Sequence, residues 1–301
     1  MPEQIAQIRD GFELCYETFG SPDDPPLLLV MGLGTQMVGW PDGFCEQLAA
    51  RGFHAIRFDN RDVGRSTHLR DQRPPTIKQL ALRDKRAAAY SLGVMAQDAV
   101  DLRDHLGIER AHVVGASMGG MIAQLVAARH QDRTLSLASI MSNTGHRFRG
   151  MPGLRVYPIF FRRPTLERDG AIEATVATFR LIGSPGLFDE DELRRIVSLS
   201  YDRGYDPAGS ARQLAAIVTS SDRAPELAHV TVPTVVIHGT KDRMVSPSGG
   251  RATARAIPGA QLVMIDGMGH DLPASLWDRI VGAIAANAAR ADAPEPRAAA
   301  A

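Results

Sequence analysis

The chain has 301 residues and carries 34 Lys plus Arg against 34 Asp plus Glu, so its formal net charge is zero. This balance predicts no basic surface for nucleic acid, and the apolar runs fall well short of the ~20 residues that a membrane-spanning helix needs. A chain of this length can bury a sizeable core and form one α/β domain.

The cysteines and the N-terminal residues predict a cytoplasmic protein. Cys15 and Cys45 are the only cysteines, and one pair cannot form a disulfide framework, so two reduced thiols are expected. Residues 1–5 lack a basic start followed by an apolar stretch, so no signal peptide is expected. The H-x-H, H-E-x-x-H and paired-cysteine patterns of metal sites are also missing, so no metal is predicted.

Strand and helix patterns alternate from the N-terminus. The sequence predicts an antiparallel hairpin around Asp10 and Gly11, and a polar loop at 67–76. The remaining predicted elements of this half are a strand at 27–31, a helix at 42–51, a strand at 53–58 and a helix at 94–106. Such alternation favours an α/β fold with a mostly parallel, twisted sheet flanked by helices.

Residues 115–120 read Gly-Ala-Ser-Met-Gly-Gly, between an apolar strand pattern at 111–114 and a helical pattern at 121–129. In this context G-x-S-x-G predicts a sharp strand-to-helix turn with Ser117 at its apex and a positive φ. A glycine-rich turn that binds phosphate is the other interpretation. The motif gains meaning only if a base and an acid follow at suitable places.

Residues 146–229, which follow a strand predicted at 135–141, break the alternation. They contain helical patterns at 171–181 and 189–200, and prolines such as Pro158 and Pro207 are expected to separate the helical pieces. We therefore expect a helical cap inserted into a core of two parts and lying over the serine. The core parts are 1–145 and 230–290, and 291–301 are expected to form a flexible tail.

Three aromatic residues of this cap are candidates for a substrate pocket: Tyr157, Phe160 and Phe161. The alternative, that they only pack the cap onto the core, is equally compatible with the sequence.

An acid and a base follow two further strands. A buried strand is predicted at 232–239, with Asp242 in the loop after it, and a last strand at 260–265 leads to His270 between flexible glycine positions. Ligand sites of open α/β sheets form at the carboxyl ends of strands. The chain order Ser117, Asp242, His270 therefore predicts a catalytic triad.

Other residues compete for two of these roles. Asp266 and Asp271 lie near His270 in sequence, but Asp266 is expected to cap the turn at the end of its strand. His112 and His238 flank strands and are expected to be structural histidines.

The three residue types supply different parts of one reaction. A serine hydroxyl needs a base to become nucleophilic, an imidazole can take and return the proton, and a carboxylate orients the imidazole. The oxyanion that develops needs preorganised donors. We expect these to be the backbone amides of Met118, next to the nucleophile, and of Leu33 in the glycine-rich loop after strand 27–31.

These segments together resemble the α/β-hydrolase fold, and more narrowly the serine carboxylesterases that include aclacinomycin methylesterase. The segments that carry the resemblance are 31–34, 39–42, 59–67, 115–120, 238–242 and 267–270. The resemblance implies a capped hydrolase that cleaves small-molecule carboxylic esters through an acyl-enzyme, without a cofactor. Leu33 stands where the methylesterase has a small residue, which implies a narrower acyl pocket.

The resemblance also implies a structural role for the segment after strand 53–58. In this fold that segment packs against the oxyanion loop, so Asp59, Arg61 and Arg65 are expected to form a network of hydrogen bonds and ion pairs.

Other functions of the fold remain open. Lactonases, amidases and carbon–carbon bond hydrolases use the same triad, whereas epoxide hydrolases and haloalkane dehalogenases place an aspartate at the position of Ser117. A ligand-binding receptor with slow turnover is a non-enzymatic alternative, which a complete triad disfavours. The sequence predicts neither the natural ester nor the oligomeric state.

Overall fold

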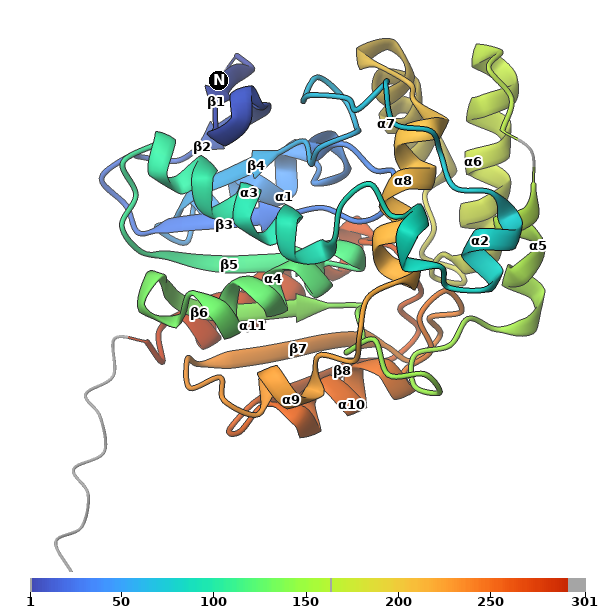
Figure 1. Cartoon of the computed structure of the whole chain (residues 1–301). Helices are drawn as coiled ribbons and strands as arrows, with labels where there is room; N and C mark the ends of the chain where they lie inside the picture. The colour runs from blue at the N-terminus through green and yellow to red at the C-terminus, as the bar shows by residue number, and fades with distance from the viewer. Residues whose placement is uncertain (1, 163, 292–301) are drawn as a thin grey trace, which may run out of the picture.

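The structure is a computed structural model that describes residues 2–162 and 164–291. Within these residues, one eight-stranded sheet has the order β1-β2-β4-β3-β5-β6-β7-β8 (Figure 1). The strands are β1 Gln4–Gln7, β2 Glu13–Phe19, β3 Pro26–Val30, β4 His54–Phe58, β5 Ala111–Ala116, β6 Thr134–Ile140, β7 Thr234–Gly239 and β8 Gln261–Ile265. β2 pairs antiparallel with β1 and β4, and the other neighbouring strands pair in parallel, as predicted.

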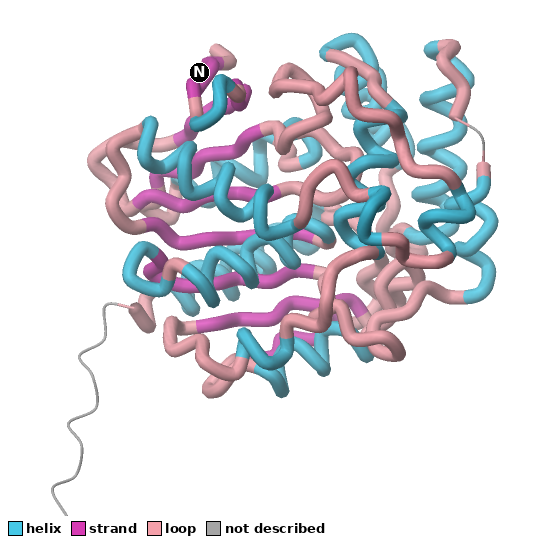
Figure 2. Tube along the Cα trace, viewed as in Figure 1, coloured by secondary structure: helices cyan, strands magenta, loops and turns pink. Residues whose placement is uncertain are grey.

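Helices cover both faces of the sheet (Figure 2). The α-helices are α1 Asp42–Ala49, α2 Ile77–Ala81, α3 Leu92–His105, α4 Met118–Arg129, α5 Tyr157–Phe161, α6 Arg168–Ile182, α7 Glu190–Arg203, α8 Pro207–Val218, α9 Ala224–Leu227, α10 Ser248–Ala256 and α11 Trp277–Ala288. None of the described helices is both long enough and apolar enough to cross a bilayer. Residues 292–301, which belong to the predicted tail, lie outside the described residues.

The central strands are buried on both faces, which explains their continuous apolar runs. Leu28 and Val30 of β3 pack into a core with α3 and α4, whereas Leu27 and Leu29 pack into a second core with α1 and α11. This division follows from the alternation of side chains along a strand.

Residues 141–233 contribute helices and no strand to the described fold. They contain α5 to α9, and α6, α7 and α8 lie beyond the carboxyl ends of the parallel strands (Figure 1). The helical patterns at 171–181 and 189–200 correspond to α6 and α7. This segment, residues 141–233, is called the insertion below.

Several predicted boundaries are corrected by the structure. Pro207 lies between α7 and α8, as predicted, and is itself the first residue of α8, because proline needs no backbone donor at the first helical position. Similarly, Pro158 lies in the first turn of α5. Helix α2 was missed, although Thr76 and Gln79 form a capping box at its start. α4 begins at Met118 rather than 121 because the turn at Ser117 leads directly into the helix.

Glycines allow α4 to pack closely against the sheet. A Cβ at Gly119 would lie 2.0 Å from the carbonyl oxygen of Val30, and a Cβ at Gly115 would lie 2.1 Å from the carbonyl oxygen of Gly119. These carbonyls belong to backbone that cannot move without shifting β3 or α4. Only glycine fits at these two positions.

We predict that Gly119→Ala lowers the free energy of unfolding by about 3 kcal/mol, because the added methyl group overpacks fixed backbone. Urea denaturation measures the change. Gly282→Ala, in α11, is the matched control: its Cβ would meet nothing closer than 3.9 Å, so a neutral or slightly stabilising effect is expected. Equal stability of the two variants would contradict the close packing.

Candidate active site

Ser117 lies at the turn between β5 and α4, with φ 55° and ψ −120°. The positive φ confirms the predicted strain at this position. Two hydrogen bonds hold the turn: the Ser117 amide donates to the carbonyl of Ile140 (2.9 Å), and the Ser142 hydroxyl donates to the carbonyl of Ser117 (2.8 Å). Ser117 is half-buried, which leaves part of its surface open to a ligand.

The structure brings the three predicted side chains together. Nε2 of His270 lies 3.0 Å from Oγ of Ser117, and Nδ1 lies 2.8 Å from Oδ2 of Asp242. With its proton on Nδ1, His270 donates to the carboxylate and accepts from the serine hydroxyl. This arrangement can remove the hydroxyl proton and hold the resulting imidazolium next to a negative charge.

Asp242 is held as a carboxylate by its surroundings. Burial raises the pKa of its carboxyl, but His270 and His238 outweigh burial and lower the pKa from 3.8 to about 2. The second carboxylate oxygen, Oδ1, accepts from the amides of Met244 and Val245, both at 2.9 Å. The carboxylate therefore also fixes the loop that carries it.

The insertion anchors the loop of His270. The His270 amide donates to the carbonyl of Ile182 at the end of α6 (2.8 Å), and the Gly269 amide donates to Oγ of Ser184 (2.8 Å). A Cβ at Gly269 would lie 2.3 Å from the carbonyl carbon of Gly183. This close approach explains the glycine before His270.

The competing carboxylates have other partners. Asp266 accepts from the Thr240 hydroxyl (2.8 Å), at the turn where it was expected. Asp271 accepts from the amide and hydroxyl of Ser184 (2.9 and 2.5 Å), and burial raises the pKa of its carboxyl.

The two structural histidines lie inside the sheet region. His112 Nδ1 lies 2.8 Å from the Ser136 hydroxyl, and His238 Nε2 lies 2.8 Å from the carbonyl of Val245. His238 also contacts Asp242 at 3.4 Å, so it supports the predicted acid without reaching the serine.

The loop after β3 passes next to Ser117. A Cβ at Gly32 would lie 3.1 Å from Cβ and 3.7 Å from Oγ of Ser117. The loop turns at Leu33 and Gly34, and the Thr35 amide donates to the carbonyl of Gly32 (3.2 Å). Leu33 thus follows directly on the residue that approaches the serine, and Met118 is the first residue of α4.

The segment after β4 supports this loop. Asn60 Nδ2 donates to the carbonyl of Met31 (3.0 Å), and Oδ1 of Asp59 accepts from the amide of Met37 (2.7 Å). Both contacts fix residues on either side of the turn at Leu33.

The charged residues of that segment form two groups rather than one. Asp59 pairs with Arg203 of α7 (2.8 Å) and accepts from the backbone amide of Arg65 (3.0 Å). Arg61 does not join them, because Asp98 takes two of its guanidinium donors (2.6 and 2.7 Å). Sequence reasoning missed Arg203 and Asp98, since no local motif marks either residue.

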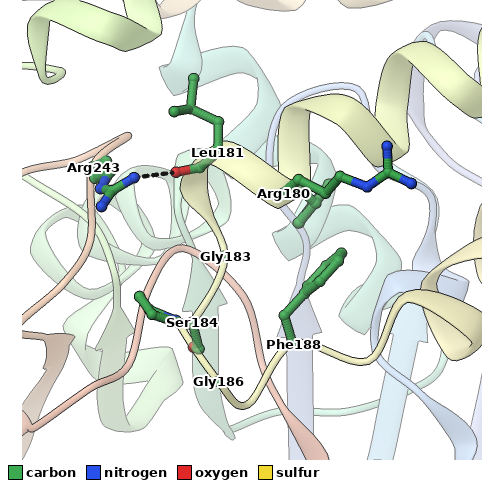
Figure 3. Close-up of a pocket in the computed structure, with 9 residues that line it drawn as sticks. Arg180, Leu181, Gly183, Ser184, Gly186, Phe188 and Arg243 are labelled. Carbon is green, nitrogen blue, oxygen red and sulfur yellow. Dashed lines mark hydrogen bonds between the residues drawn. The ribbon is translucent and has the colours of Figure 1, made fainter.

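The predicted pocket residues lie in α5. Tyr157 and Phe160 are half-buried, and the side chain of Phe161 lies outside the described structure. A surface hollow of about 360 Å³ lies at the end of α6 and the segment that follows it, and neither Ser117, Tyr157 nor Phe160 lines it (Figure 3). Its lining residues include Phe179, Leu181, Ser184, Phe188 and Arg243. The substrate pocket in α5 stays a prediction.

One group of described residues has the geometry of metal ligands: Asp62, His68 and Asp206 offer atoms within 4.8 Å of one another. The guanidinium of Arg212 already neutralises the two carboxylates, because it pairs with Asp62 (2.7 Å) and with Asp206 (3.4 Å). His68 uses both ring nitrogens on Asp206 and on the carbonyl of Gly64. The group serves as a structural network.

Comparison with known proteins shows the family to which the fold belongs. Residues 25–274 match the family described as alpha/beta hydrolase fold. The chain is 30% identical over 309 residues to rhodomycin D methylesterase DauP of Streptomyces sp. (strain C5), with 95% of this chain and 98% of that protein covered. Rhodomycin D methylesterase DnrP of Streptomyces peucetius shows the same identity and coverage. The solved enol-lactonase from Burkholderia xenovorans LB400 is 26% identical, with a TM-score of 0.70 over 96% of this chain and 98% of that chain.

The charge of Asp242 predicts an acid-sensitive fold. Because its pKa falls from 3.8 to about 2 on folding, its contribution to stability is present above about pH 4 and is lost as the pH falls toward 2. We expect the free energy of unfolding, measured by urea denaturation, to decline more steeply with acid for the wild type than for Asp242→Asn. Equal pH dependence of the two proteins would contradict the assigned charge.

Proposed function

This chain belongs to the α/β hydrolase fold family, and we propose that it hydrolyses carboxylic esters through an acyl-enzyme formed on Ser117. The observation that carries the proposal is the continuous chain of contacts from Ser117 through His270 to Asp242. Each contact has the length of a hydrogen bond, and each residue type matches one part of the reaction.

The reaction starts with proton transfer. His270 Nε2 takes the proton of the Ser117 hydroxyl as Oγ attacks the ester carbonyl. Asp242 holds the proton on Nδ1 and stabilises the imidazolium that forms. The proton then passes to the leaving alkoxide, which departs as an alcohol and leaves the acyl group on Ser117.

The amides of Leu33 and Met118 serve as the oxyanion donors in this proposal. Met118 is the first residue of α4, where backbone amides point away from the helix and its dipole favours negative charge. Leu33 follows Gly32, whose close approach to Ser117 supports the position of the second donor.

Water completes the cycle. His270 removes a proton from a water molecule, which attacks the acyl-serine carbonyl, and the serine oxygen recovers the proton as the carboxylic acid leaves. The scheme uses no cofactor.

The remaining predictions concern organisation and location. Residues 146–229 act as a cap over a core formed by 1–145 and 230–290; the position of α6 to α8 beyond the strand ends supports this division (Figure 1). A cytoplasmic location is compatible with Cys15 and Cys45, which are buried and unpaired with each other.

Methyl esters of carboxylic acids are the first substrates to test, because the relatives at 30% identity are named as methylesterases. A second candidate is a cyclic ester, favoured by the 26% identity to a solved enol-lactonase. Both reactions use the same attack on an ester carbonyl, and a panel of methyl esters and lactones compares their kcat/KM values.

We predict that Ser117→Ala lowers the kcat for p-nitrophenyl ester hydrolysis by roughly four to six orders of magnitude, because the nucleophile is removed. Ser136→Ala is the control. Its hydroxyl contacts His112 rather than His270, so activity within about threefold of the wild type is expected. Retention of most activity by Ser117→Ala would reject the proposed function.

Two aspartate variants identify the acid of the triad. Asp242→Asn is expected to lower kcat by roughly 10⁴-fold, since an amide favours the wrong imidazole tautomer. Asp271→Asn, next to His270 but bonded to Ser184, is expected to cost less than about tenfold. The kcat values of both variants on one ester decide the assignment, and a reversed ranking would overturn it.

A further inference from the structure

We propose that Gln213, in helix α8 of the insertion, is a positioning residue that aims the Leu33 amide at the oxyanion. The proposal rests on the proposed ester hydrolysis and deepens it, because it assigns to the insertion a part in transition-state binding. The supporting observation is a direct contact between α8 and the loop after β3.

Gln213 joins two pieces of backbone through its side-chain amide. Its Oε1 accepts from the Gly34 amide (2.8 Å), and its Nε2 donates to the carbonyl of Arg61 (2.7 Å). The side chain is fully buried. Its orientation is determined by its partners, because an amide N–H can only donate and a carbonyl can only accept. A buried polar bridge with both ends satisfied restrains its partners strongly.

The geometry of the turn explains why this contact matters for Leu33. The Thr35 amide closes the turn on the carbonyl of Gly32, so the turn's own hydrogen bond uses neither central amide, that of Leu33 or that of Gly34. Gly34 has φ +64°, which lets its amide meet Gln213. The Gly34 amide belongs to the peptide unit that joins Leu33 to Gly34, so its bond to Gln213 fixes that unit. The amide of Leu33 itself is left for the reacting carbonyl.

Helix α8 is itself held firmly at this place. Arg212, the neighbour of Gln213, pairs with the buried carboxylate of Asp62 through two donors (2.9 and 2.7 Å). A Cβ at Gly209 would lie 2.1 Å from the carbonyl oxygen of Asp62, so the start of α8 touches the backbone after β4. Gln213 therefore connects the loop to a rigid support rather than to a mobile lid.

The expected consequence lies in the transition state. An amide placed an ångström away from the developing oxyanion loses much of its stabilising effect, whereas ground-state binding of an ester depends little on it. Loss of Gln213 should lower kcat more than it changes KM, and it should weaken inhibitors that form an oxyanion on Ser117.

The test compares Gln213→Leu with the wild-type protein. We expect a roughly 10- to 100-fold lower kcat on p-nitrophenyl butyrate with KM changed by less than about threefold. A trifluoromethyl ketone is attacked at its carbonyl by the oxygen of Ser117 and forms a tetrahedral oxyanion. Its inhibition constant should rise by a similar factor. A simple loss of stability would not produce this matched pair of changes.

Gln124→Leu is the matched control. Gln124 of α4 is also fully buried and bonds to the Ser139 hydroxyl and the Arg223 guanidinium, away from the turn at Leu33. It should lower the melting temperature while kcat stays within about threefold. Where Gln213→Leu does not fold, Gln213→Glu decides: its carboxylate still accepts from Gly34 but cannot donate to Arg61. We then expect kcat to fall below the wild-type value and the inhibition constant to rise by a similar factor, with KM changed by less than about threefold.

The outcomes separate this proposal from the proposed function. The role of Gln213 would be overturned if a folded Gln213 variant kept the wild-type kcat and inhibitor affinity. It would also be overturned if Gln124→Leu lowered kcat by the same factor. In both cases Ser117→Ala would still abolish hydrolysis. Hydrolysis that survives Ser117→Ala would instead overturn the proposed function, and the Gln213 proposal with it.

Discussion

The close packing of the start of α4 against the end of β3 is the constraint on which the rest of the structure depends. Gly119 leaves no room for a side chain beside the carbonyl of Val30, so the first turn of α4 lies directly against the end of β3. The chain can make so sharp a turn only with Ser117 in a left-handed conformation. That strain places the hydroxyl above the sheet, next to His270 and to the loop of Gly32.

The insertion contributes more than a cover to this arrangement. Ile182 and Ser184 hold the loop of His270, and Gln213 holds the turn at Gly34. The candidate base and one candidate oxyanion donor are therefore both supported from outside the sheet. A change of packing in α6 or α8 would alter the geometry around Ser117 without touching any reacting group.

Buried ion pairs fix how the insertion meets the core. Arg203 of α7 pairs with Asp59, and Arg212 of α8 pairs with Asp62; all four residues are nearly inaccessible to solvent. Burying such charges costs desolvation, so these pairs contribute little net stability compared with apolar packing. Removal of one partner, however, would leave the other charge buried and unpaired. The pairs thus specify one position of α7 and α8 against the segment after β4.

The sequence by itself determined the α/β order, the strained turn at Ser117, and the positions of Asp242 and His270 after their strands. These features have local signals, because glycines, strand runs and loop positions are read within a few residues. Only the tertiary structure decided the partners Arg203, Arg212 and Gln213, and the separation of Arg61 from Asp59. Their contacts join residues more than 35 positions apart, and such contacts depend on how the insertion folds back over the sheet. A single chain read along its length carries no signal for that packing.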